Sequence, residues 1–282
     1  MKRKSLKLVF TLSLLSIIFV GCGNNSSNVN DKGESSKEQA TISISGSTSV
    51  GPLMGKIAEV YEENNSNISI EINEVGSSAG IKDAINGVSE IGMSSRELKE
   101  EEAREVEETI IAYDGIAIIT NKENPIKNIT IDEIKEIYTG KITNWNQIEG
   151  GKDAPIVVVS REDGSGTRDA FQEIIGYNSE ELVEDALITN GTGSIKQTVI
   201  GNKNAIGFVS FEYLDDKVNI VSVENFEPNA EAVQSGNYKI SRPFIVVNKE
   251  DRLSEEGQKF IEFILSEEGQ QIVADNKAIP VK

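Results

Sequence analysis

The amino-acid sequence predicts an α/β fold for the chain that follows about residue 40. Apolar runs of strand length alternate with segments in which apolar residues recur at helical spacing. Glycine- and hydroxyl-rich segments follow several of these runs and open the next helical pattern. This alternation is typical of α/β architecture with largely parallel sheets. The strand candidates are residues 41–45, 68–75, 90–93, 109–120, 156–160, 205–210, 218–223 and 240–247.

The N-terminus has the pattern of a secretory signal. Basic residues precede an apolar run at 8–20, and Gly21 and Cys22 follow it. This run is shorter than the roughly 20 residues that a membrane-spanning helix needs. Residues 19–22 resemble a bacterial lipobox, which implies cleavage before Cys22 and a lipid, palmitate, on its sulfur. An ordinary signal peptide, or a short anchor helix with an incidental cysteine, is the alternative.

A flexible tether is expected between the signal peptide, residues 1–21, and the folded part. Residues 22–39 are rich in Asn, Ser, Gly, Lys and Glu and hold too few apolar side chains to fold. Cys22 is the only cysteine, so no intramolecular disulfide is possible. About 240 residues remain from Ala40 onward, which is enough for one large domain or two smaller ones.

Helical patterns fill the spaces between the strand candidates. Thr130 and Glu133 have the spacing of a capping box. Further apolar side chains recur at helical spacing before and after it: Ile57, Val60, Tyr61, Ile134, Ile137, Phe260, Ile261, Phe263, Ile264 and Leu265.

Two apolar runs, 110–121 and 240–248, are long for single strands. Both are candidates for crossings between two lobes. One lobe would then be discontinuous, residues 40–115 plus 246–282, and the other would be residues 116–245. One wide sheet with two long strands explains the runs equally well.

Composition excludes several classes of function. The chain has 46 acidic and 28 basic residues, and four basic residues lie in the signal, so the mature chain carries a net charge of −22. Nucleic-acid binding needs a basic face and is excluded. The chain has no histidine, which removes the Ser-His-Asp mechanism and the commonest metal ligand. We expect no catalytic residue, no metal and no cofactor.

Three segments, 45–52, 76–80 and 163–168, share one design. Each follows a strand candidate, is rich in Gly and Ser or Thr, and opens a helix. Hydroxyls and the free N–H groups of a helix's first turn can bind an anion together. One such segment is weak evidence, because Gly-Ser turns often only cap helices. Three are stronger, because strand carboxyl ends in α/β sheets face the same crevice.

Arg161 makes the third segment the most specific. The rigid guanidinium fork matches tetrahedral oxyanions and stands just before the hydroxyls of a helix start. We expect Asp163 to orient Arg161 and to offset part of its charge. The alternative is a surface arginine beside a capping loop. The acidic chain does not exclude an anion site, because distant charges are screened over roughly 8–10 Å.

The pattern Arg161-x-Asp163-Gly164-Ser165-Gly166-Thr167 resembles the signature of the phosphate-binding proteins of phosphate ABC transporters. Residues 46–52, 76–80 and 137–145 resemble other stretches of that family, and the likeness extends from residue 40 to the end. It implies a periplasmic-binding-protein type II fold, in which two α/β lobes joined by two crossing strands close on the ligand. Inorganic phosphate and the membrane permease subunits of an ABC transporter are the implied partners.

The resemblance also implies the site. The residues that it implies contact phosphate are Thr48, Ser49, Ser77, Arg161, Ser165, Gly166 and Thr167. Many family members place an aspartate, which accepts a proton from phosphate, where this chain has Ser95. Asp114 is the candidate replacement, and a hinge residue is the alternative. Arg96 is either a second cation near the site or solvent-exposed.

The implied function is high-affinity binding of inorganic phosphate and its delivery to the permease. The expected location is the extracellular face of the bacterial cell membrane, held by the lipid on Cys22. A receptor for another tetrahedral oxyanion (sulfate, molybdate or a phosphonate) is the first alternative. A phosphate-ester hydrolase is less favoured, since no Asp/Glu cluster has metal-ligand spacing. An adhesion or scaffolding lipoprotein would not need three anion loops.

Overall fold

The computed structural model describes residues 39–281. The predicted signal peptide and Cys22 lie outside the described residues, as does the tether up to residue 38. Within the described part, no helix combines the length and the apolar character needed to cross a lipid bilayer.

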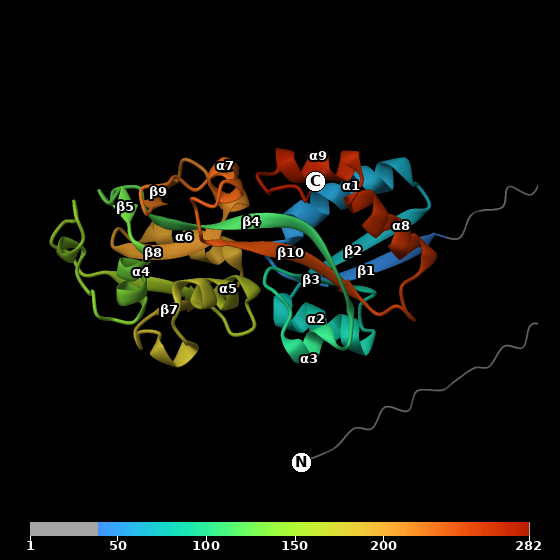
Figure 1. Cartoon of the computed structure of the whole chain (residues 1–282), viewed down its shortest axis with the longest axis horizontal. Helices are drawn as coiled ribbons and strands as arrows, with labels where there is room; N and C mark the ends of the chain where they lie inside the picture. Colours follow the sequence, from blue (N-terminus) through green and yellow to red (C-terminus); the bar gives the residue numbers. More distant parts are fainter. Residues whose placement is uncertain (1–38, 282) are drawn as a thin grey trace, which may run out of the picture. The chain divides into compact units, whose positions relative to one another are not determined.

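One half of the fold is built on three parallel strands, β1 (Ala40–Gly46), β2 (Ile68–Glu74) and β3 (Ile91–Ser94). Its helices come from both ends of the chain (Figure 1): α1 (Gly51–Asn64), α2 (Ser77–Asn86), α3 (Glu100–Ala103), α8 (Glu255–Ile264) and α9 (Glu267–Asp275). Tyr61 of α1 packs against Phe260 and Phe263 of the α8 region, with ring centroids 5.1 Å apart in both pairs. The C-terminal helices therefore complete the core that the N-terminal strands begin.

The second half is built from the middle of the chain. Its strands are β5 (Asn128–Ile129), β6 (Val157–Arg161), β7 (Leu187–Thr189), β8 (Ala205–Ser210) and β9 (Val218–Val223). Its helices are α4 (Ile131–Tyr138), α5 (Gly166–Ile175), α6 (Thr192–Gly201) and α7 (Ala230–Gln234), with 3-10 turns at Trp145–Gln147, Ser179–Glu181 and Phe211–Tyr213. The predicted capping box of Thr130 and Glu133 starts α4 and is confirmed.

Two long strands, β4 (Glu107–Asn121) and β10 (Ser241–Asn248), run between the halves (Figure 1). The strand order is β2-β1-β3-β10-β4-β8-β6-β7, so β10 and β4 stand at the centre. The first part of β4 pairs with β10, and its last residues pair with β8 and β9. The α/β fold with two crossing strands is therefore confirmed.

The expectation of largely parallel sheets is only partly right. Neighbouring strands within each half are parallel, but β10 is antiparallel to β3 and β4, and β4 is antiparallel to β8 and β9. The cause is the connectivity, because β4 carries the chain out of the first half and β10 carries it back. Two adjacent strands that travel in opposite senses must pair antiparallel.

Buried apolar side chains form two large clusters, and the two crossing strands contribute to both. In β4, Ile111 and Ala112 belong to the cluster of the first half, whereas Ile116 belongs to that of the second. In the β10 region, Phe244 belongs to the cluster of the first half and Ile240 to that of the second. Each fully buried large apolar side chain contributes about 1.5–3 kcal/mol, so each half has its own source of stability. The lobe boundaries at 115/116 and 245/246 stay a prediction.

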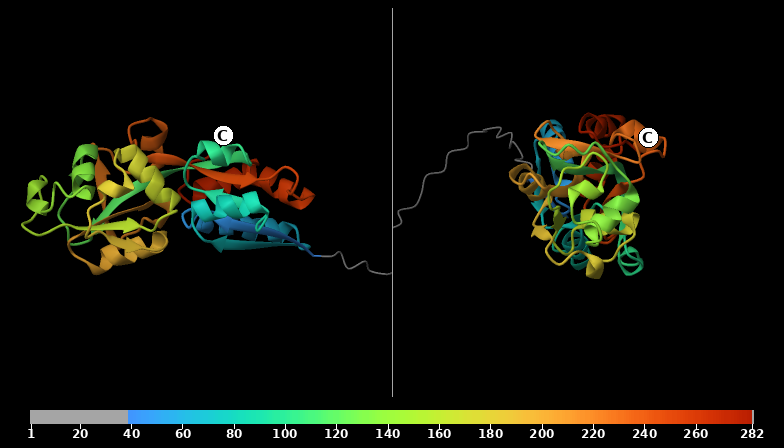
Figure 2. Two further views of the ribbon diagram at one scale, coloured as in Figure 1. Left: turned by 90° about the horizontal axis from the view of Figure 1, so that it is seen from below. Right: turned by 90° about the vertical axis from the view of Figure 1, so that its left-hand side faces the viewer.

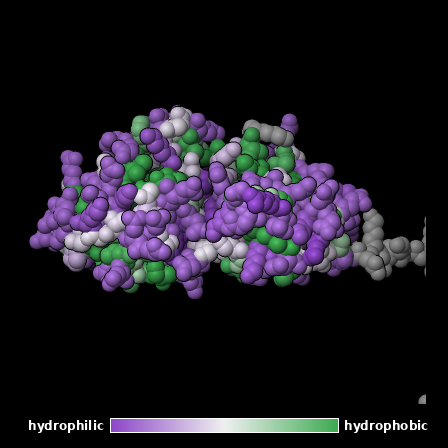
Figure 3. Space-filling view, turned by 60° about the horizontal axis from the view of Figure 1, so that its bottom comes forward, coloured by the Kyte–Doolittle hydropathy of each residue, from purple (hydrophilic) through white to green (hydrophobic). Residues whose placement is uncertain are grey.

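The two ends of the described chain lie together in one half (Figure 2), and one face of the surface is mainly hydrophilic (Figure 3). Figure 2 shows the N-terminal strands and the C-terminal helices side by side in one half of the described part, in agreement with the packing of Tyr61 on Phe260. Figure 3 shows a face on which hydrophilic residues predominate and apolar residues form separate patches. Scattered apolar residues of this kind are normal on a folded domain.

Candidate ligand-binding site

Four helices begin at glycine- and hydroxyl-rich segments that meet between the two halves. Three are the segments expected from the sequence, before α1, α2 and α5, and the fourth opens α6. Gly76 and Gly191 cap α2 and α6 with φ of 92° and 80°, values that favour glycine. The first-turn N–H groups of a helix have no intrahelical acceptor and carry partial positive charge. The four starts therefore supply donors to one region.

Seven hydroxyl side chains of the described residues form one hydrogen-bonded group, the hydroxyl cluster. Its members are Ser47, Thr48, Ser49, Ser77, Ser95, Thr167 and Thr192. Ser49 Oγ lies 2.7 Å from both Thr167 Oγ1 and Thr192 Oγ1. These two contacts join the start of α1 to the starts of α5 and α6 and so link the two halves of the fold.

Ser95 lies inside the hydroxyl cluster. Its Oγ accepts a hydrogen bond from Ser47 Oγ at 2.9 Å, and it lies 3.3 Å from Ser77 Oγ and 3.4 Å from Thr167 Oγ1. The side chain is fully buried at the carboxyl end of β3. A hydroxyl, which can donate or accept, thus occupies the position where a carboxylate was expected.

Arg161 reaches the cluster from the end of β6. Its side chain is 2% exposed, and Nη1 and Nη2 donate to Thr192 Oγ1 at 2.9 Å and Thr48 Oγ1 at 3.1 Å. The other edge of the guanidinium makes two hydrogen bonds of 2.7 and 2.6 Å to the carboxylate of Glu162. Partial burial favours the neutral form of Glu162, but the hydrogen bonds and charge of Arg161 outweigh it and hold the pKa of Glu162 below its ordinary value.

The expectation that Asp163 orients Arg161 is wrong. Asp163 pairs instead with Arg168 at 2.7 Å, and its side chain is 95% exposed. Glu162 is the residue that orients Arg161, and Gly191 N also donates to Glu162 Oε2 at 3.3 Å. The longer side chain of Glu162 can reach back to the guanidinium of its own neighbour, whereas Asp163 enters the turn before α5.

Ser165 and Gly166 form the start of α5. Ser165 caps the helix, since its Oγ accepts from Arg168 N at 3.3 Å. Gly166 lies so close to α2 that a Cβ there would come within 2.2 Å of Ser77 Oγ. In addition, Ser78 N donates to Gly164 O at 3.1 Å. The helix starts of the two halves are therefore in direct contact, and the glycine is needed for this approach.

Asp114 has partners outside the hydroxyl cluster. It accepts hydrogen bonds from Ser210 Oγ at 2.9 Å and Phe211 N at 3.2 Å, and it lies 3.0 Å from Arg242 Nη2. Both charged side chains are at most 2% exposed on the crossing strands. Burial raises the pKa of Asp114 to about 6, against the opposing effect of Arg242. Asp114 thus occupies the crossing, and Ser95 is the candidate acceptor that the structure brings to the hydroxyls.

Thr192 was not expected from the sequence. The segment Asn190-Gly191-Thr192-Gly193-Ser194 has the same composition as the other three, but the strand before it, β7, has only three residues. Short strands carry too little apolar pattern to be recognised. The Gly-Thr-Gly-Ser motif was the signal that could have revealed this fourth helix start.

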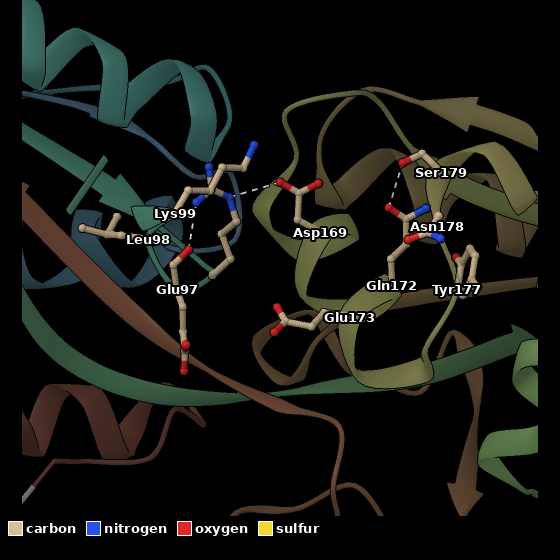
Figure 4. Close-up of a pocket in the computed structure, with 10 residues that line it drawn as sticks. Glu97, Leu98, Lys99, Asp169, Gln172, Glu173, Tyr177, Asn178 and Ser179 are labelled. Atoms are coloured by element: carbon tan, nitrogen blue, oxygen red, sulfur yellow. Dashed lines mark hydrogen bonds and ion pairs between the residues drawn. The ribbon is translucent and has the colours of Figure 1, made fainter. Parts of the chain in front are cut away.

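Arg96 is buried beside the cluster, with 4% of its surface exposed, so the solvent-exposed alternative is wrong. It donates to Ser78 Oγ at 3.1 Å, to both oxygens of Glu102 at 2.7 and 2.8 Å, and to Asp169 at 3.1 Å. A groove of about 520 Å³ adjoins it, lined on one side by residues 96–99 and on the other by side chains of α5 and the segment after it (Figure 4).

The chemistry of the cluster is that of an anion receptor. It offers hydroxyls, first-turn N–H groups and one guanidinium, and the carboxylate beside that guanidinium, Glu162, is bound to it. Among residues 39–281, no group of three or more Cys, Asp or Glu side chains is arranged to hold a metal ion.

Comparisons with known proteins agree with this description. A model of the PBP superfamily domain matches residues 32–268. The phosphate-binding protein PstS of Bacillus subtilis is 32% identical over 291 residues, covering 100% of this chain and 95% of that protein. PstS of Borreliella burgdorferi is 30% identical over 252 residues, covering 86% of this chain and 90% of that protein.

Solved structures give the same result. The chain superposes with a TM-score of 0.85 on a Clostridium perfringens protein described as a phosphate ABC transporter substrate-binding protein with bound phosphate. That protein is 59% identical, with 86% of this chain and 100% of that chain covered. A phosphate transport receptor from Vibrio cholerae follows, with 35% identity, a TM-score of 0.72 and coverage of 86% and 100%. The chain therefore belongs to the PstS family of phosphate-binding proteins, within the PBP superfamily.

Proposed function

We propose that this protein binds inorganic phosphate outside the cell and delivers it to the permease of an ABC transporter. The observation that carries the proposal is the hydroxyl cluster, closed by Arg161 and built from helix starts of both halves. The names of its relatives, which are phosphate-binding proteins, support the same ligand. The role is one of binding and delivery, without catalysis.

In this proposal phosphate replaces the hydrogen bonds that the cluster now makes with itself. Two nitrogens of Arg161 already point at the hydroxyls of Thr192 and Thr48. Rotation of these two hydroxyls would leave the guanidinium N–H groups free to donate to phosphate oxygens. The proposed contacts are Thr48, Ser49, Ser77, Ser95, Arg161, Ser165, Gly166 and Thr167, and we add Thr192. Oxygens held by several charge-assisted and neutral donors are bound tightly in a site that excludes water.

We further propose that the two halves act as lobes, residues 40–115 with 246–282 and residues 116–245, which close on the ligand. The contacts of Ser49 with Thr167 and Thr192 cross this boundary and support the proposal. Hinges at the crossing strands would let the lobes separate, as in other two-lobed receptors.

The direct test is calorimetric titration of the purified full-length protein in detergent with phosphate, arsenate, sulfate and methylphosphonate. Phosphate should bind with a dissociation constant in or below the micromolar range and more tightly than sulfate. Failure of phosphate to bind, or tighter binding of sulfate, would refute the proposed ligand.

A receptor for a different tetrahedral oxyanion is the alternative, which the phosphate-binding relatives do not favour. Ser95 is the residue at which it can be tested. A carboxylate at this position would accept a proton from phosphate and repel sulfate, which has none to give. A hydroxyl can donate to a fully deprotonated oxygen as readily as it accepts. The titration with sulfate therefore decides between the two candidates.

We also propose that the lipid on Cys22 holds the protein at the extracellular face of the membrane. The support is the sequence pattern of residues 1–22, together with its single cysteine. Replacing Cys22 with alanine should release the protein into the medium or stall its processing. Continued membrane association with normal cleavage would contradict the lipid anchor.

A further inference from the structure

Arg96 stands at a contact between the two halves that is separate from the hydroxyl cluster. Its Nε donates to Asp169 Oδ2 at 3.1 Å, and Asp169 belongs to α5 of the second half (Figure 4). Arg96 itself follows β3 of the first half. In this region an ion pair therefore links the lobes.

The guanidinium is already fixed by the first half. Both oxygens of Glu102 accept from it, at 2.7 and 2.8 Å, and the carbonyl of Glu97 accepts at 2.8 Å. Burial lowers the pKa of Arg96, but Glu102 and Asp169 together more than compensate and raise it above its ordinary value. Arg96 thus stays charged and oriented whether or not Asp169 is present.

Asp169 is the more exposed partner of the pair. Its side chain is 32% exposed, against 5% for Arg96, so it can be solvated when the lobes part. Arg96 also donates to Ser78 Oγ at 3.1 Å, next to Ser77 of the cluster. Formation of the ion pair is therefore coupled to the same approach of α2 and α5 that brings the hydroxyls together.

We propose that Arg96 and Asp169 form a latch that holds the lobes closed on the ligand and sets how long it stays bound. The inference rests on the proposed phosphate binding and deepens it. Neither side chain needs to touch phosphate, so both are positioning residues. Loss of the latch should speed lobe opening, and hence release, while the encounter with the open protein is unchanged.

The test compares wild type with Asp169→Asn in the full-length protein, using phosphate as the probe. Phosphate release is followed by stopped-flow mixing of loaded protein with an excess of a fluorescent phosphate trap. At about 20 mM salt the dissociation rate should rise roughly three- to tenfold, and the association rate should stay within about twofold. At about 0.5 M salt the ratio of the two dissociation rates should fall only slightly, because an ion pair whose arginine is 5% exposed is screened much less than an exposed pair.

Glu173→Gln is the matched control. Glu173 lies one turn further along α5 and lines the same groove, and no ion pair is found for it among the described residues. Glu173→Gln removes one negative charge from α5, as Asp169→Asn does, but leaves the partners of Arg96 in place. The dissociation rate of phosphate from this variant should therefore match that of wild type. The latch is refuted if Asp169→Asn releases phosphate at the wild-type rate, or if Glu173→Gln accelerates release equally. If wild type binds no phosphate, the proposed function fails first and the inference fails with it.

Discussion

Replacing Arg161 by alanine should weaken phosphate binding by about 2–5 kcal/mol, or roughly 30- to 4,000-fold in the dissociation constant. The guanidinium is 2% exposed and aims two N–H groups at hydroxyls of the cluster. A hydrogen bond to a charged group contributes about 1.5–3 kcal/mol, so two such bonds contribute about 3–6 kcal/mol, which overlaps this range. The variant also leaves Glu162 without its partner, which adds repulsion toward an anion.

Calorimetric titration of both proteins at fixed pH and salt measures the effect. Arg161→Ala combined with Glu162→Gln should recover part of the loss, because it removes the repulsion but not the missing donors. Arg252→Ala, which removes an exposed positive charge elsewhere, should bind as wild type does. Thermal unfolding of all variants checks that the fold survives. An unchanged dissociation constant in Arg161→Ala would remove Arg161 from the site.

Three other outcomes test separate parts of the description. Thr192→Val should weaken phosphate binding about fivefold, because one neutral hydrogen bond contributes about 1 kcal/mol. Ser194→Ala, the control, should leave phosphate binding unchanged. Asp114→Asn should lower the urea-derived free energy of unfolding by about 3–5 kcal/mol, because it leaves Arg242 buried without its counter-ion; a narrower gap between phosphate and sulfate in this variant would instead support Asp114 as the proton acceptor. Burial raises the pKa of Glu212 to about 8 from 4.5, so its proton stabilises the fold at low pH and this contribution is lost as pH rises through 8. Between pH 7 and 9 the free energy of unfolding of the wild type should fall by about 1.4 kcal/mol, and that of Glu212→Gln should not.

Strand positions were predictable because apolar runs are a local signal. All eight strand candidates correspond to strands, and the two long runs became the crossing strands β4 and β10. The strands β5 and β7 were missed, since two or three residues hold no period. The antiparallel sense of the crossing strands was also missed. A strand's pattern of side chains is the same in either direction, so its sense depends on the connections and not on its own residues.

The site was predictable where its residues lie in one short segment. Arg161 and Thr167 come from one motif, and the structure places both in or beside the hydroxyl cluster. Partnerships between side chains were less predictable. Asp163 was chosen over Glu162 for Arg161 because spacing alone does not show which carboxylate turns back toward the strand.

Asp114 illustrates the same difficulty at long range. It was considered for its place in the first crossing strand, but its counter-ion, Arg242, lies in the second crossing strand, far along the chain. Only the antiparallel pairing of the two strands sets these residues opposite each other in register. No local pattern in the sequence could have indicated that this carboxylate already had a partner.

The buried arginines also explain how a strongly acidic chain can hold an anion. Among the described residues four arginines are buried, and each pairs with a carboxylate: Arg96 with Glu102 and Asp169, Arg161 with Glu162, Arg168 with Asp163, and Arg242 with Asp114. The region around the cluster therefore carries little net positive charge. Attraction for an anion must come from aligned hydroxyls, first-turn N–H groups and the remaining donors of Arg161, all of which act over a few ångströms. Such a site depends on local geometry and is nearly independent of the total charge, which is why short glycine- and hydroxyl-rich segments indicated it and composition did not.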